Sequence, residues 1–305
     1  MISFESFGKT ERLGNHLFQY VFLRTTARRL QVKFHCPDWV GESIFLLNDD
    51  DERTDTIIDV NKLYRQPYNN CGYTKCALNI KDGTDIIGYF QSERYFDREN
   101  VKKWFAFKDD AIALVKDKYK NINFHESTGL HLRFGDMKND LKYMLLPKEY
   151  YSKALSKIRR QKNVLVFSDE IESARQVLDG IDANFIYVSG NRDYEDLYLM
   201  TRCHDFICSV STFSWWGAWL NDWPDKIVVA PPEGIRSGHY VRCPDFCCKD
   251  WIPVQTARFL FDDYRFLIWR QELRKARARN FKDNVWCLKN YLMKKIKKTK
   301  FFVSR

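Results

Sequence analysis

The stretch Glu195–Asp222, which reads EDLYLMTRCHDFICSVSTFSWWGAWLND, decides the fold. A helical pattern is followed by a short apolar strand, Phe206–Cys208, and then by a second, apolar helix. Hydroxyl side chains gather where this second helix must begin: Ser209, Ser211, Thr212 and Ser214. Side-chain caps and backbone N–H groups therefore converge at one point, which is how helix N-termini bind anions. A capped core helix that binds no ligand has the same local pattern, so both interpretations stay open.

Strand and helix patterns alternate on both sides of this stretch, from residue 128 to residue 231. This alternation predicts a parallel sheet with helices on both faces. The strands that we expect are Thr128–Arg133, Val164–Phe167, Asn184–Val188 and, as the last, Lys226–Pro231. Residues 1–36 read as strand, glycine-containing loop, helix and strand, which opens a second Rossmann-like unit. A chain of 305 residues with this pattern predicts an α/β fold of two lobes.

The charge of the chain is concentrated at its C-terminal end. Residues 270–305 contain 13 Lys and Arg against two acidic residues, whereas the rest of the chain has a net charge of −1. Apolar residues follow helical steps from Phe281 to Ile296, so the segment fits an anionic lipid surface, with a solvated tail as the alternative. Nucleic-acid binding places its charge on the folded face that reads the nucleic acid, so we expect no nucleic-acid partner.

The start of the chain and the cysteines indicate the compartment. Residues 1–5 lack the basic start and apolar run of a signal peptide, and no stretch has the ~20 apolar residues of a membrane-spanning helix. Nine cysteines favour reduced thiols in a cytoplasm. Cys243, Cys247 and Cys248 lack zinc-site spacing, so we expect no metal.

Three positions carry candidate chemistry. Arg133 ends a buried strand and therefore needs an anionic partner, for which a phosphate or the nearby Asp136 would serve. Asp169 follows an apolar strand, and ligands bind at the carboxyl ends of parallel strands. Gly14 permits close approach of backbone to a ligand, while Asn15 is either a ligand contact or a helix N-cap.

Five segments, taken together, resemble the alpha-1,2-fucosyltransferases of glycosyltransferase family eleven. They are Arg12–Gln19, Gly88–Ser92, His131–Asp136, Phe167–Glu170 and the stretch Glu195–Ala218 with which we began. The chain departs from the family pattern at Val210, where Asn is usual, and at Phe134, which replaces the second Arg of a His-Val-Arg-Arg-Gly-Asp motif.

The resemblance implies two facing lobes of the GT-B type and an inverting transfer of L-fucose from GDP-β-L-fucose. The acceptor would be a hydroxyl, typically the 2-OH of a galactose, in a surface polysaccharide or O-antigen. A lipid-linked glycan as acceptor is consistent with the basic tail. No metal or cofactor is implied beyond this co-substrate. The lobes that we expect are residues 1–125 on the acceptor side and 126–255 on the GDP-fucose side, followed by a basic helical tail, 256–305. The tail has no counterpart in the family segments, and its charge, rather than the resemblance, would place a cytoplasmic enzyme on the inner face of the membrane. A fucosyltransferase of another linkage (1,6- or protein O-type) and a non-catalytic basic binding module remain alternatives.

The resemblance also implies roles for individual residues. Catalysis is assigned to Arg133, Asn15 and Asp136. The donor would be bound by Arg12, Gly14, Asn15, His131, Arg133, Ser168, Asp169, Thr212, Phe213 and Ser214. Tyr89, Phe90 and Tyr95 are candidate stacking platforms for a sugar, and aromatic side chains are more often core. The candidates for the catalytic base, which must reach the acceptor hydroxyl, are Asp136, Glu11, His16 and Glu93.

Overall fold

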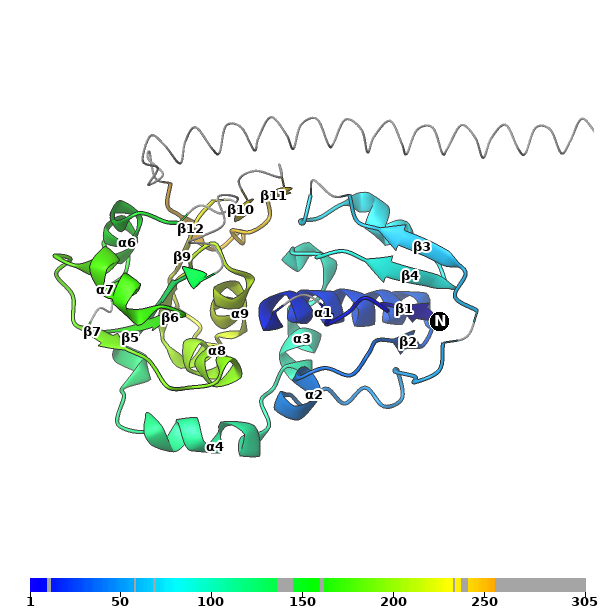
Figure 1. The fold of residues 1–305 in the computed structure, drawn as a ribbon, viewed down its shortest axis with the longest axis horizontal. Helices are drawn as coiled ribbons and strands as arrows, with labels where there is room; N and C mark the ends of the chain where they lie inside the picture. Colours follow the sequence, from blue (N-terminus) through cyan, green and yellow to red (C-terminus); the bar gives the residue numbers. More distant parts are fainter. Residues whose placement is uncertain are drawn as a thin grey trace, which may run out of the picture.

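The described residues of the computed structural model form two parallel β-sheets with helices packed against them (Figure 1). The structure describes residues 1–9, 12–57, 59–67, 70–135, 145–159, 162–232, 234–236 and 241–255. The predicted α/β fold with two parallel sheets is confirmed. The predicted tail, 256–305, lies outside the described residues, and the domain boundaries at 125 and 255 stay predictions. None of the described helices is both long and apolar enough to cross a membrane.

The first sheet lies within residues 2–87 and has the strand order β2-β1-β4-β3, with every neighbouring pair parallel. Its strands are β1 (Ile2–Ser3), β2 (Phe34–His35), β3 (Lys62–Arg65) and β4 (Thr84–Ile87). Helix α1 (Leu13–Leu30) connects β1 to β2 and is buried along most of its length. The shorter helices of this half are α2 (Gly41–Ile44), η1 (Lys75–Asn79), η2 (Glu93–Tyr95), α3 (Arg98–Trp104) and α4 (Asp109–Lys118).

The second sheet has the strand order β12-β9-β8-β5-β6-β7, which is the doubly wound arrangement. Its strands are β5 (Ser127–Leu132), β6 (Asn163–Ser168), β7 (Phe185–Tyr187), β8 (Asp205–Ile207), β9 (Val228–Ala230) and β12 (Ile252–Pro253). The helices are η3 (Phe124–Glu126), α6 (Lys148–Leu155), α7 (Ile171–Leu178), α8 (Asp193–Arg202) and α9 (Thr212–Leu220). The prediction that β9 is the last strand was wrong, because the antiparallel pair β10 (Gly234–Arg236) and β11 (Val241–Cys243) leads to β12 beside it. The order of strands reverses between β5 and β8, and that switch point positions the site.

The two halves meet where α1 packs against α9 (Figure 1). Trp215, Trp216 and Trp219 of α9 are at most 1% exposed, and the Phe18 ring of α1 lies 4.6 and 4.8 Å from the first two. The indole Nε1 of Trp216 donates to the carbonyl of Gly14 at 3.0 Å. The tryptophans of the stretch that decides the fold therefore join the two lobes, and burial of such large rings stabilises the contact by several kcal/mol, on the order of 2 kcal/mol or more per ring.

The acidic run 49–52 is a charge run, which by itself predicts a solvated loop. The structure differs from this prediction at the two ends of the run. Asp49 is 8% exposed and accepts a hydrogen bond from the Tyr20 hydroxyl at 2.8 Å, and Glu52 pairs with Arg24 and with Arg28, both on α1. These two carboxylates anchor α1, because a cation buried on that helix needs carboxylate partners from outside it, while the two residues between them are exposed.

Candidate active site

A cavity of about 760 Å³ lies between the two sheets and is lined by residues of both halves. From the second half it takes the segments that follow the carboxyl ends of β5, β6, β7 and β8, at the switch point of the doubly wound sheet. From the first half it takes the N-terminus of α1 and residues 89 and 91 after β4. Its size lies within the range of roughly 300–1,000 Å³ that holds small-molecule ligands.

Two helix N-termini point into this cavity. Helix α1 begins after Arg12, which makes no side-chain cap, and α9 begins after Ser211, whose hydroxyl accepts from the Phe213 N–H at 3.3 Å. The helices approach closely because residue 14 is glycine: a Cβ there would lie 2.5 Å from the Phe213 backbone nitrogen. The two N-termini, and with them their partial positive charges, therefore lie next to each other where the halves meet, which favours an anion there.

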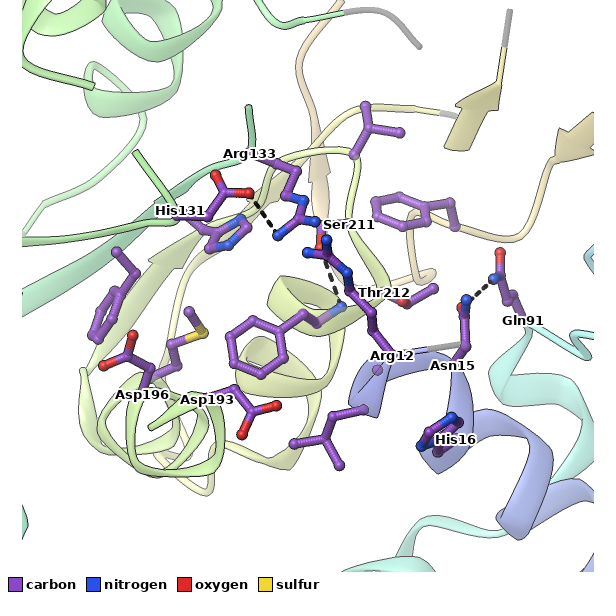
Figure 2. A pocket seen from close by; sticks show the side chains of 18 of the residues that line it. Arg12, Asn15, His16, Gln91, His131, Arg133, Asp193, Asp196, Ser211 and Thr212 are labelled. Carbon is purple, nitrogen blue, oxygen red and sulfur yellow. Dashed lines mark hydrogen bonds and ion pairs between the residues drawn. The ribbon is translucent and has the colours of Figure 1, made fainter. Parts of the chain in front are cut away.

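Arg133 supplies a full positive charge at the same place. Its side chain is 15% exposed, and its Nη1 lies 2.7 Å from Oδ2 of Asp169 (dashed at Arg133 in Figure 2). The other oxygen of Asp169 accepts from the Phe134 N–H at 2.9 Å. Asp169 thus holds the guanidinium in position, while Asp136, the partner considered from the sequence, lies outside the described residues.

Arg12 brings a second guanidinium from the first half. It lines the cavity, and Figure 2 shows its side chain extending toward the region of Arg133. Phe134, which stands where the family motif has its second Arg, is 6% exposed and belongs to the core of the second half. The cavity thus has an arginine from each half, although the motif position of the second Arg is occupied by Phe134.

His131 faces the cavity as a neutral ring. It is 4% exposed, and burial lowers its pKa to about 3. Its Nδ1 lies 2.7 Å from the Ser209 hydroxyl. At neutral pH this side chain therefore offers hydrogen bonds without charge and cannot neutralise a phosphate.

Asn15 lies in the first turn of α1 and is not its N-cap, because the cap position is Arg12. Its Oδ1 accepts a hydrogen bond from Nε2 of Gln91 at 2.9 Å (Figure 2). The alternative of a simple cap is therefore wrong, and Asn15 is a cavity residue held by a second side chain.

The remaining predicted donor contacts separate into two groups. Ser168, Thr212 and Phe213 line the cavity. Ser214 is fully buried, and its hydroxyl donates to the carbonyls of Ser209 and Ser211 at 3.3 and 3.0 Å. Ser214 is absent from the described lining of the cavity, and its hydroxyl instead fixes the turn before α9.

Two acidic residues were not selected from the sequence. Asp193 and Asp196 stand in the first turn of α8 and line the cavity. Burial raises the pKa of Asp196 to about 6, against a hydrogen bond from Asn191 that lowers it. The rule that selected Asp169, a polar residue after a strand of the parallel sheet, applies equally to the segment after β7 and was available from the sequence.

Of the three aromatic candidates for a sugar platform, only Tyr89 lines the cavity. Phe90 is 0% exposed and stacks on Phe22 with ring centroids 3.6 Å apart. Tyr95 is 6% exposed, and its hydroxyl donates to the Gly72 carbonyl. Both are core residues of the first half.

The candidate bases also separate. His16 lines the cavity, whereas Glu93 accepts from the indole Nε1 of Trp219 at 3.0 Å. Glu11 and Asp136 lie outside the described residues. Within the described ranges, no group of three or more His, Cys, Asp or Glu side chains is placed to hold a metal ion.

Two known proteins are similar to this chain in sequence. The chain is 32% identical over 171 residues to the O-antigen biosynthesis glycosyltransferase WbnK of Escherichia coli, covering 51% of this chain and 57% of that protein. It is 29% identical over 190 residues to an alpha-1,2-colitosyltransferase of Escherichia coli, covering 58% and 64%. The matched region thus spans less than two thirds of the length of either relative.

Solved structures and a family pattern complete the comparison. The fold is similar to POFUT1 in complex with GDP-fucose (TM-score 0.47, 11% identity, 74% and 95% of the two chains). It is similar also to the fucosyltransferase NodZ from Bradyrhizobium (TM-score 0.47, 14% identity, 71% and 91%). The sequence pattern of Glycosyl transferase family 11 matches residues 10–255, which include the second sheet, helices α1 and α9 and the residues that line the cavity. The resemblance drawn from the five segments is therefore confirmed, and the chain belongs to glycosyl transferase family 11.

Proposed function

We propose that this protein transfers L-fucose from GDP-β-L-fucose to a hydroxyl of a glycan, with inversion, and that the acceptor hydroxyl is the 2-OH of a galactose. The observation that carries the proposal is the convergence of Arg133 and the N-termini of α1 and α9 on one cavity between two lobes. Family membership supports glycosyl transfer as the reaction class.

The chemistry explains why the positive charge is needed. In glycosyl transfer the sugar centre becomes cation-like while the nucleotide diphosphate departs as an anion. Groups that bind the leaving diphosphate more tightly in the transition state than in the ground state accelerate this step. In our proposal Arg133 binds the diphosphate, Arg12 adds charge from the opposite lobe, and the backbone N–H groups at Thr212 and Phe213 assist.

The nucleoside part of the donor would lie along the second sheet. Guanine presents adjacent N–H donors, which a carboxylate accepts well. We assign this role to Asp169 or Asp196; the two bonds that Asp169 already accepts from Arg133 and Phe134 favour Asp196. Neutral His131 would bind a nucleoside atom, and Ser168 would contact the same part.

The sugar and acceptor would lie against the first lobe. Gly14 and Asn15 close over the phosphates and fucose, and Tyr89 offers a ring face for the acceptor. Because it lines the cavity, His16 joins Asp136 as a candidate base. The GT-B arrangement, with the donor on residues 126–255 and the acceptor on residues 1–125, belongs to the same proposal.

The experiment is a transfer assay with GDP-fucose and a panel of terminal galactosides, followed by linkage analysis of the product. We expect α-1,2-linked fucose, with turnover that survives chelation of divalent cations. A 1,6-linked or peptide-linked product would replace the proposed linkage. GDP binding by calorimetry without turnover on any acceptor would indicate a binding module instead.

One of the relatives gives a reason to test colitose as a second donor sugar. One relative is named an alpha-1,2-colitosyltransferase, so the sugar subsite of this chain is to be tested with GDP-colitose beside GDP-fucose. A preference for GDP-colitose above tenfold in kcat/KM would reassign the donor and leave the diphosphate site unchanged. The other relative, named for O-antigen biosynthesis, supports a surface polysaccharide as acceptor, which would be lipid-linked during assembly.

A further inference from the structure

Gln91 connects Asn15 to a residue from the far end of the described chain. Its Nε2 donates to Oδ1 of Asn15 at 2.9 Å, and its Oε1 accepts from the thiol of Cys243 at 3.1 Å. The three side chains are 4%, 8% and 2% exposed, respectively, and all three line the cavity. A hydrogen-bonded chain thus runs from β11 through Gln91 to the first turn of α1.

The chain has a direction. The Cys243 thiol donates to Oε1 of Gln91, and this contact leaves Nε2 as the end of the carboxamide that faces Asn15. Gln91 then donates an N–H to Asn15, and Asn15 accepts this hydrogen bond with its Oδ1. The amide Nδ2 of Asn15, a donor, is consequently directed away from Gln91.

The backbone before Gln91 is held in a costly conformation. Phe90 has a φ of 52°, in the left-handed region that a bulky residue adopts at a cost on the order of 1 kcal/mol or more. Gln66 compensates, because its Oε1 accepts from both the Tyr89 N–H at 2.8 Å and the Phe90 N–H at 3.0 Å. The stacked rings of Phe90 and Phe22 fix the same turn. The backbone is therefore strained at residue 90, and this strained turn places the side chain of Gln91 next to Asn15.

We propose that Gln91 is a positioning residue for transfer: it fixes the carboxamide of Asn15 so that its N–H donors face the diphosphate and sugar of the donor. The inference rests on the proposed function, in which Asn15 closes over these groups. An Asn15 in the opposite orientation would turn its carbonyl oxygen toward an anion. The direction of the Gln91 hydrogen bond thus decides whether the first turn of α1 attracts or repels the donor.

The test is the substitution Gln91→Glu, which keeps the shape of the side chain and removes its donor. We expect GDP affinity, measured by calorimetry, or kcat/KM for GDP-fucose to fall at least tenfold, since a hydrogen bond to a charged group is lost and a repulsion replaces it. Asn15→Ala alone gives a loss of similar size. Gln91→Met introduces no charge into the cavity, so Asn15→Ala with Gln91→Met gives no further loss if Gln91 acts through Asn15. Additive losses in the double variant would overturn the proposal.

Gln19 provides a matched control. It is also 4% exposed and donates to the Gly88 carbonyl at 3.0 Å, on the same loop, without lining the cavity. Gln19→Glu therefore carries the same cost of a buried carboxylate, and we expect lower stability with kinetics within threefold of the unsubstituted protein. Equal kinetic losses in Gln19→Glu and Gln91→Glu would show a general structural effect and refute the positioning role.

Cys243 supplies a second, milder perturbation. Cys243→Ala removes the donor to Oε1 of Gln91 and is expected to lower GDP affinity and turnover severalfold, whereas Cys243→Ser keeps a donor and is expected to lower both by a smaller factor. Equal behaviour of the two variants would contradict the directed chain. If the unsubstituted protein binds GDP and turns over no GDP-fucose, the proposed function fails while the GDP affinities of these variants still decide the inference.

Discussion

Removal of the Arg133 guanidinium is the most direct perturbation of the site. Arg133→Ala deletes the cation that we assign to the diphosphate, and it leaves Asp169 without its ion pair at 2.7 Å. Asp169 keeps the hydrogen bond from the Phe134 N–H at 2.9 Å, so the turn after β5 stays supported. We therefore expect a folded protein whose midpoint of thermal unfolding is within a few degrees of the unsubstituted chain.

Two losses determine the size of the effect on activity. A hydrogen bond to a charged group contributes about 1.5–3 kcal/mol. The uncompensated Asp169 would repel the diphosphate by about 2 kcal/mol, for one unit of charge at a separation of ~8 Å and an effective dielectric constant of ~20. The sum of about 3.5–5 kcal/mol corresponds to a fall in kcat/KM of about a thousandfold.

The assay compares kcat/KM for GDP-fucose among Arg133→Ala, Asp169→Asn and the double variant. Since Asp169→Asn removes the repulsion, we expect the double variant to exceed Arg133→Ala by about 30-fold. An Arg133→Ala protein within tenfold of the unsubstituted enzyme would refute the assignment of Arg133 to the diphosphate. A double variant no better than the single one would refute the role given to Asp169.

Three further predictions concern the helix contact, pH and the tail. Gly14→Ala should lower the free energy of unfolding by about 2 kcal/mol or more and abolish transfer, because its Cβ would meet the Phe213 backbone nitrogen at 2.5 Å. Chemical denaturation measures the first effect and the transfer assay the second. A variant that is both active and stable would contradict the contact. The pKa of Asp196 is raised from 3.8 to about 6, so the contribution of this carboxyl to stability is fully present below pH 3.8 and is lost as pH rises through 6. Binding of the guanine base, in contrast, needs the ionised carboxylate. The shift in unfolding temperature caused by GDP should therefore be smaller at pH 5 than at pH 7.5, and Asp196→Asn should remove that difference; an unchanged pH dependence in this variant would exclude Asp196. Deletion of residues 270–305, which carry a net charge of +11, should abolish flotation with anionic liposomes; equal flotation of both forms would reject the membrane contact.

The parallel sheets, and the location of the cavity at the carboxyl ends of strands, were predictable from the sequence. The α/β alternation sets the sheet type, and the rule that ligands bind at a switch point selects the segments after β5, β6 and β8. Asp169 was found this way, whereas Arg133 was found because a charged residue that ends a buried strand needs an anionic partner; the resemblance to the family then assigned both to the donor site. Asp196 was not predicted as a site residue, because an acidic residue in the first turn of a helix such as α8 is common for helix stability alone.

Pairings between distant residues belong to the tertiary structure alone. Nothing in the local pattern indicates that Gln91 bonds to both Asn15 and Cys243, which are 76 and 152 positions away. The partners of Trp215, Trp216 and Trp219 were equally unpredictable, since an apolar helix can be buried within one lobe or between two. Helical and strand periodicities report which face of an element is buried, and they carry no information on which element covers it.

The sequence by itself determined the class of the fold, the family and the cationic end of the strand that carries Arg133. Only the tertiary structure decided that α1 and α9 aim their N-termini at one cavity, that Arg133 rests on Asp169, and that a strained turn delivers Gln91 to Asn15. The physical reason is that periodicity and motifs are local properties of the chain, whereas charge convergence and hydrogen-bond direction depend on how distant segments pack.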